Sequence, residues 1–161
     1  MWTHPPKHRY QFSESAQTLA EGLAEFRAAF PGLKCREALS PAAQAFFTSH
    51  DTVHVIYGCG TSMTDEAVVK LASLFGTSGG LSILSGYILH DSMDTYRRLP
   101  LGGTLAAMLL APYLLARTLW RCTRQRVKWP WIDHDQYMHM PLRDLRARFG
   151  IKVTHRQCKA D

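Results

Sequence analysis

The spacing of apolar residues predicts helices along almost the whole chain. In the segment 13–30 the apolar positions fall on one helical stripe, formed by Ala16, Leu19, Leu23, Phe26 and Phe30. Pro31-Gly32 ends this helix, and Ser40-Pro41 starts a second one with a capping hydroxyl followed by proline at the first helical position. We expect the second helix to continue to Tyr57, just before the glycine-rich turn at 58–60.

The remaining helices are predicted in the same way. They cover Thr64 to Gly76, 81–98, 104–128 and Leu142 to Phe149, the last one opened by Pro141 and closed by Gly150. The chain shows no alternating strand pattern of useful length and no long internal repeat. The sequence therefore predicts an all-α fold, a single-domain helical bundle of about five to six helices over residues 1–161.

Composition narrows the class of protein. The 161 residues are 46% hydrophobic and 20% charged, which is typical of a globular chain and excludes a disordered one. The four cysteines, at positions 35, 59, 122 and 158, include no C-x-x-C pair, so neither a zinc ribbon nor a thioredoxin-type redox site is expected. The opening residues are polar and do not form a signal peptide. We expect a reduced protein in the cytoplasm.

The positive charge lies in the C-terminal third. Residues 117–161 carry eleven Lys and Arg against four Asp and Glu, whereas residues 1–116 carry eight against nine. Arg117, Arg121 and Arg124 share one face of the predicted helix, with Trp120 beside them. This pattern is typical of contact with anionic lipid headgroups, but an ordinary solvated basic face explains it equally well. No nucleic-acid-binding motif accompanies the charge, so we expect no nucleic-acid partner.

An uncharged stretch precedes this basic segment. Residues 99–116 contain no Asp, Glu, Lys or Arg, but Pro100, Gly102-Gly103 and Pro112 interrupt them. We therefore favour a buried or lipid-facing helix over a membrane span. The small residues of the two apolar helices either leave room for a prenyl chain or let the helices pack closely; they are Ser82, Ser85, Gly86, Ala106 and Ala107.

The candidate chemistry lies in the second helix, at His50-Asp51-Thr52-Val53-His54. At helical geometry His54 lies roughly 40° around the axis from His50 and Asp51 roughly 100°, so all three lie on one side of the helix. Imidazoles spaced i, i+4 bind one metal from consecutive turns. Eleven residues separate His54 from Glu66, and a helical hairpin of that length brings this second carboxylate back toward the histidines.

Two histidines on one helix face also occur as packed polar residues without a metal. Here the addition of two carboxylates at a workable spacing favours a metal site. The imidazole and carboxylate ligands suit one divalent metal, with zinc first and Mn, Fe or Co as alternatives.

The motif resembles the metal-binding signature of the Coq-four family of ubiquinone (coenzyme Q) biosynthesis proteins. That resemblance rests on His50-Asp51-x-x-His54 followed by Glu66 and Lys70, and it is clearest over residues 40–120. Asp65 departs from the pattern, because the family usually has glycine there. The closing helix, with Leu142, Asp144 and Leu145, is similar to the family's last helix.

The resemblance implies a metal held by His50, Asp51, His54 and Glu66 beside an apolar groove for a lipid tail. It implies removal of the carboxyl group at ring carbon one of a prenylated benzoate, with hydroxylation, at the inner membrane, to which the protein would attach peripherally. The alternative is a non-catalytic, lipid-binding scaffold of a quinone-biosynthesis complex, with other biosynthetic enzymes and the membrane surface as partners. A homo-oligomer is compatible with either function.

A different class of enzyme uses an adjacent His-Asp pair for metal-dependent phosphate-ester hydrolysis. His90-Asp91 is a second such pair, and together with His50-Asp51 it could supply ligands for that chemistry. We favour it less, because it does not account for Glu66.

Overall fold

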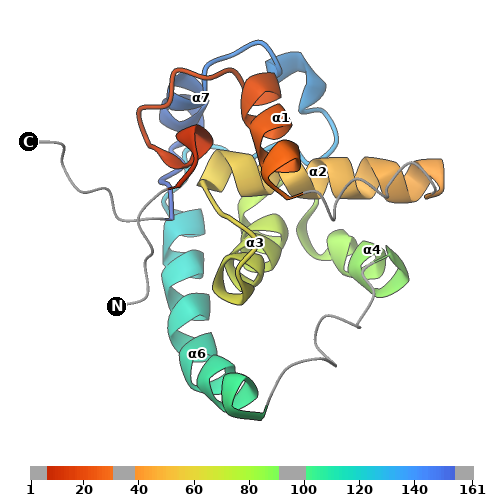
Figure 1. The fold of residues 1–161 in the computed structure, drawn as a ribbon, viewed down its shortest axis with the longest axis vertical. Coiled ribbons are helices and arrows are strands. Elements are labelled where there is room, and N and C mark those ends of the chain that lie inside the picture. The colour runs from red at the N-terminus through yellow and green to blue at the C-terminus, as the bar shows by residue number, and fades with distance from the viewer. Residues whose placement is uncertain (1–6, 31–38, 91–100, 155–161) are drawn as a thin grey trace, which may run out of the picture.

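The computed structural model describes residues 7–30, 39–90 and 101–154 of the chain (Figure 1). Within these segments the fold is all-α, as predicted. The α-helices are α1 Leu19–Ala29, α2 Pro41–Tyr57, α3 Met63–Gly76, α4 Ile83–His90, α6 Leu101–Thr123 and α7 Leu142–Phe149. Short 3-10 turns lie at η1 Arg9–Gln11, η3 Gly80–Ser82 and η4 Asp135–Tyr137.

The helix boundaries follow the capping residues. Ser40 and Pro41 open α2, and Gly58 ends it at a φ of 67°. Gly150 ends α7 in the same left-handed conformation, at a φ of 70°. These boundaries are those that the sequence predicts.

Three predicted helices have wrong boundaries. The first helix begins at Leu19 rather than near Ser13, because Thr18 and Glu21 form reciprocal hydrogen bonds that cap it there. The third begins at Met63, with Ser62 as the cap instead of Thr64. The predicted helix 104–128 is displaced toward the N-terminus, since α6 covers Leu101–Thr123.

The predicted helix 81–98 is only partly within the described residues. It begins as the η3 turn and continues as α4 to His90. Its remainder, 91–98, lies outside the described segments, and so does Asp91 of the second His-Asp pair.

Helix α2 is the central element of the bundle. Every residue from 49 to 57 is buried, because α1, α3, α4 and α7 all pack against it (Figure 1). The core around it contains Val53, Val55 and Ile56, all fully buried. Because this part of α2 is covered on every side, its polar side chains face protein, so the two histidines must find partners there.

Arg146 of α7 connects the N-terminal segment around η1 to this core. Its guanidinium is buried and donates hydrogen bonds to backbone carbonyl oxygens on α2 and in the N-terminal segment, namely those of Val55, Ile56, Tyr10, Phe12 and Ser13. Burial lowers the pKa of this guanidinium to about 10. The interaction holds η1, α2 and α7 together at the C-terminal end of α2.

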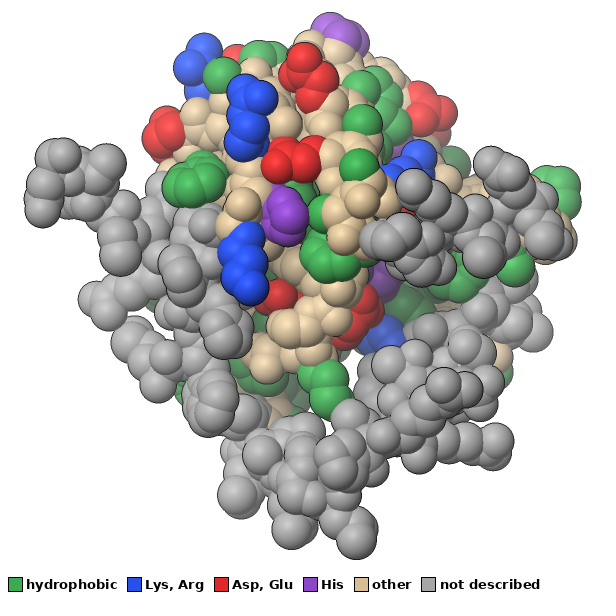
Figure 2. Space-filling view, in the orientation of Figure 1, with side chains coloured by type: hydrophobic (Ala, Val, Ile, Leu, Met, Phe, Trp, Pro, Cys, Tyr) green, Lys and Arg blue, Asp and Glu red, His purple; other side chains and the backbone are tan. Residues whose placement is uncertain are grey.

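Figure 2 shows acidic and basic side chains interspersed on one face of the molecule, with no large area of a single charge. Cys59 and Cys122 are buried free thiols. Among the described helices, none combines the length and the hydropathy that crossing a membrane requires.

Candidate metal centre

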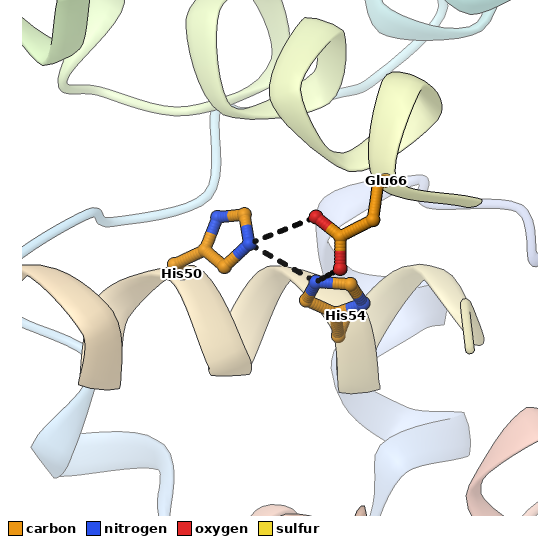
Figure 3. A group of neighbouring side chains, drawn as sticks. All are labelled: His50, His54 and Glu66. Carbon is orange, nitrogen blue, oxygen red and sulfur yellow. Dashed lines mark hydrogen bonds and ion pairs between the residues drawn. The ribbon is translucent and has the colours of Figure 1, made fainter. Parts of the chain in front are cut away.

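Three of the four predicted ligands converge between α2 and α3. His50 and His54 point from consecutive turns of α2 toward Glu66 on the first turns of α3 (Figure 3). The two Nε2 atoms are 3.1 Å apart, and the Glu66 carboxylate oxygens lie 3.4 Å from Nε2 of His54 and 3.6 Å from Nε2 of His50. The candidate ligand atoms all lie within 4.8 Å of one another, so the group could hold a metal ion.

The donors fit a divalent transition metal. Two imidazole nitrogens and one carboxylate oxygen form the His, His, Glu set of several catalytic zinc sites, in which a fourth position is left for water or substrate. The same donors suit Mn, Fe and Co, and the geometry does not choose among these metals.

The α2–α3 turn brings Glu66 to the histidines. Gly58 reverses the chain in the left-handed conformation, and a Cβ at this position would lie 3.2 Å from the Gln11 carbonyl oxygen. Ser62 then caps α3 by accepting a hydrogen bond from the Asp65 N–H. Because these two residues place the end of α2 and the start of α3 next to each other, Glu66 faces the Nε2 atoms of the histidine pair.

The group is largely removed from solvent. His54 is 1% exposed and His50 7%, whereas the Glu66 side chain is 30% exposed. Burial alone would raise the pKa of Glu66, but the hydrogen bond with His50 and the nearby His54 and Lys70 hold it below its ordinary value. Glu66 is therefore an anion at neutral pH, the form in which a carboxylate binds metal.

His54 is held in one orientation by its surroundings. Its Nδ1 atom lies 2.9 Å from the Gly60 carbonyl oxygen, and its ring stacks on Phe26 of α1 with 4.9 Å between centroids. Asp65 stabilises the same turn by accepting hydrogen bonds from the Gly60 N–H and the Ser62 hydroxyl. Asp65, which departs from the pattern of the Coq-four motif that the sequence resembles, thus stabilises the turn that orients His54.

Asp51, the fourth predicted ligand, does not join this group. Its Oδ2 accepts a hydrogen bond from Nε of Arg27 on α1 at 3.2 Å, and the carboxylate is 1% exposed. Asp51 directly follows His50 on the helix, so its side chain points in a different direction from that of His50, toward α1 rather than toward α3. Sequence spacing did not reveal this, because it does not indicate which neighbouring helix each side of α2 faces.

Tyr87 of α4 is a contact that the sequence analysis missed. Its hydroxyl oxygen lies 2.9 Å from Nδ1 of His50, on the side of the ring away from Glu66. No local motif marks this tyrosine, and only the packing of α4 against α2 brings it to the histidine.

The predicted basic surface on α6 is only partly exposed. Trp120 is 52% exposed and Arg124 is exposed, with its guanidinium 4.2 Å from the Trp120 ring centroid. Arg117 and Arg121 are half-buried. The pKa of Arg121 is lowered mainly by its burial and also by the positive charge of the neighbouring Arg117. The exposed part of this surface therefore consists of Trp120 and Arg124.

A cavity of about 530 Å³ opens beside the N-terminal half of α2. Its walls include the aromatic rings of Phe46 and Trp131 and four small residues, which are Ala45, Ser49, Ser85 and Gly86. Phe46 lies one helical turn before His50, and its ring contacts the Tyr87 ring edge-on at 5.1 Å. Phe46 and Tyr87 therefore lie between the cavity and the histidine pair.

No protein-family model matches this chain, and comparisons with curated proteins and with solved structures found no match. The geometry of the His50, His54 and Glu66 group and the sequence motif are therefore the observations that bear on function.

Proposed function

We propose that this protein is a metal-dependent enzyme of ubiquinone biosynthesis that acts on the head group of a prenylated benzoate precursor. The convergence of His50, His54 and Glu66 on one point is the observation that carries the proposal. The specific pathway is inferred from the resemblance of the His50–Glu66 motif to the Coq-four family. The proposed reaction replaces the carboxyl group at ring carbon one by a hydroxyl group.

This replacement breaks the ring–carboxyl bond, releases carbon dioxide and takes the new hydroxyl oxygen from water or dioxygen. It removes two electrons from the precursor, so dioxygen or another two-electron oxidant is a required co-reactant. A divalent metal held by His50, His54 and Glu66, with zinc the first candidate, would act as a Lewis acid toward the substrate's phenolate or carboxylate. The buried imidazoles would limit water at this point. Lys70, one turn after Glu66 on α3, adds positive charge beside the site.

The cavity beside Phe46 is the proposed binding place of the isoprenoid tail. It is large enough for an apolar chain segment, and its aromatic walls lie one helical turn from the histidines. Phe46 and Tyr87 lie between this cavity and the histidines, so a ring attached to the tail would approach the metal group past these two side chains. This arrangement follows the expectation of an apolar groove next to the metal.

The first test is metal content. We would purify the untagged chain, supplement it with zinc and measure bound metal by elemental analysis, with His50→Ala and Glu66→Ala as site variants and His139→Ala, an exposed histidine, as control. We expect about one metal per chain in the wild type and the control, and loss of metal in both site variants. Absence of metal in the wild type would refute a metal-dependent function.

The second test is turnover. The metal-loaded protein would be incubated with a prenylated benzoate under air, and carbon dioxide and the hydroxylated product would be measured together. Product formation that His54→Ala abolishes would support catalysis. A metal-bound protein without turnover would favour the scaffold function instead.

The exposed Trp120–Arg124 pair favours that second candidate, a lipid-binding scaffold that docks on the cytoplasmic side of the inner membrane. An aromatic ring stacked with a cation suits the interface of an anionic bilayer. Co-sedimentation with vesicles containing anionic lipid should fall in Trp120→Ala and Arg124→Gln but not in Arg143→Gln, which alters an exposed arginine of α7. Equal binding by all four proteins would discard this surface.

A further inference from the structure

Two arginines of α6 lie one helical turn apart, and both are half-buried. Arg117 and Arg121 occupy positions i and i+4, so their side chains are neighbours on one face of the helix. After burial, the charge of Arg117 is the strongest of the influences that lower the pKa of Arg121. The two guanidinium groups therefore lie close enough to repel each other, and each has lost part of its contact with water.

In the described part of the chain, no carboxylate on the elements around this pair offsets its positive charge. Helix α6 contains no Asp or Glu, and neither does the segment 150–154. Helix α3, which packs along α6, carries Asp65 and Glu66, but these bond to the α2–α3 turn and to the histidines. Partly buried cations of like charge are unfavourable without an anion, and a bound anion would offset their repulsion.

The hydrogen bonds of the pair leave most of its donors available. Nη2 of Arg117 donates a hydrogen bond to the Thr154 carbonyl oxygen at 3.4 Å, where the C-terminal segment passes α6 (Figure 1). Within the described residues, the Arg121 guanidinium forms no hydrogen bond or ion pair. The contact with Thr154 orients one guanidinium, and the remaining N–H groups of both can donate to a ligand.

We propose that Arg117 and Arg121 form a binding site for a phosphate group. Guanidinium groups on adjacent turns suit a tetrahedral oxyanion, because each planar fork can donate two parallel hydrogen bonds to it. Tyr113, one turn before Arg117, adds an exposed hydroxyl on the same face. The phosphate group belongs either to a soluble phosphate compound or to a lipid headgroup, and both are recognised by the same chemistry. The site is independent of the proposed metal centre.

Arg124 provides a matched control on the same side of α6. It is exposed, and its guanidinium lies 4.2 Å from the centroid of the Trp120 ring, on which it stacks. An exposed arginine keeps its water and gains little from a single anion. Arg124→Gln therefore removes one positive charge from this region without removing a donor of the proposed site.

The first measurement is calorimetric titration of inorganic phosphate into the full chain at constant ionic strength. A chelator is used beforehand, so that phosphate cannot bind through a metal. We expect about one phosphate per chain in the wild type and in Arg124→Gln. Affinity should fall about tenfold or more in Arg117→Gln and in Arg121→Gln, because each substitution removes charge-assisted hydrogen bonds.

The second measurement identifies the source of the phosphate group. Co-sedimentation uses vesicles of phosphatidylcholine with and without phosphatidylglycerol. If the site takes a lipid headgroup, binding to the phosphatidylglycerol vesicles falls in Arg117→Gln and Arg121→Gln, even where free phosphate does not bind. Phosphate binding that depends on these arginines, with vesicle binding that does not, assigns the site to a soluble phosphate compound.

The proposal is overturned if the wild type binds neither probe, or if both substitutions leave the binding of both probes unchanged. Neither result bears on the metal centre, because metal content is measured separately. Circular dichroism would confirm that each variant is folded. If the Gln variants do not fold, Arg121→Lys keeps the aliphatic stem and the charge but loses the planar fork, so it should bind the same probe more weakly than the wild type. Wild-type affinity in Arg121→Lys would then overturn the proposal.

Discussion

The Asp65 carboxylate accepts a hydrogen bond from the backbone N–H of Gly60 at 3.1 Å, and the carbonyl of that same glycine accepts one from His54. A turn between two helices therefore connects a buried carboxylate to the orientation of a candidate metal ligand. The side chain at position 65 thus supports the histidine through the Gly60 backbone.

Asp65→Ala should weaken both the fold and the metal site. It removes the acceptor for the Gly60 N–H and for the Ser62 hydroxyl, at a cost of about 1–3 kcal/mol in the free energy of unfolding. Zinc affinity should fall as well, because the turn no longer holds His54. Urea unfolding and zinc competition would measure the two effects, with the exposed Asp144→Ala as control. Unchanged zinc affinity would show that the turn holds its shape without Asp65.

Asp51→Asn separates the two roles open to this carboxylate. In the structure Asp51 pairs with Arg27, so we expect the substitution to lower the free energy of unfolding by about 1–2 kcal/mol, after allowing for the exposure of Arg27. Bound zinc should remain. Thermal unfolding and elemental analysis of the same sample would measure both properties. Loss of zinc with unchanged stability would return Asp51 to the ligand set that the sequence predicts.

The lowered pKa of Glu66 predicts a stability that depends on pH on the acid side. A carboxyl group with a lower pKa in the folded state stabilises the fold above its ordinary pKa of 4.5. This contribution is lost as the pH falls below that value and through the lowered one. Urea unfolding of metal-free wild type and Glu66→Gln should therefore show a stability difference that shrinks between about pH 5 and about pH 3. A difference that is constant over this range would contradict the ion pairing.

Arg146→Met should be among the most destabilising single substitutions in this chain. It leaves several buried carbonyl oxygens without their donor, and we expect a loss of at least about 3 kcal/mol in the free energy of unfolding. Arg146→Lys should restore only part of this loss, because an ammonium cannot reproduce the planar set of guanidinium donors. Chemical denaturation would measure the series. The exposed Arg143→Met should stay within about 0.5 kcal/mol of the wild type.

Local sequence signals predicted much of the fold. Ser40-Pro41, Gly58 and Gly150 correctly marked where α2 and α7 begin or end, because capping depends on residues within one turn. The start of α1 was missed since Ser13 and Thr18 are both suitable caps, and only Thr18 has Glu21 at the reciprocal position. A capping residue thus predicts the start of a helix more reliably when the reciprocal residue three positions later is considered as well.

The sequence by itself determined that the chain is helical and that His50 and His54 share one face of a helix. Both properties follow from the helical repeat and need no tertiary contact. The tertiary structure decided that Glu66 reaches these histidines, that Asp51 turns to Arg27, and that Tyr87 lies behind His50. These pairings depend on which helix faces meet when the bundle packs around α2, and the spacing of residues along a single helix does not contain that information.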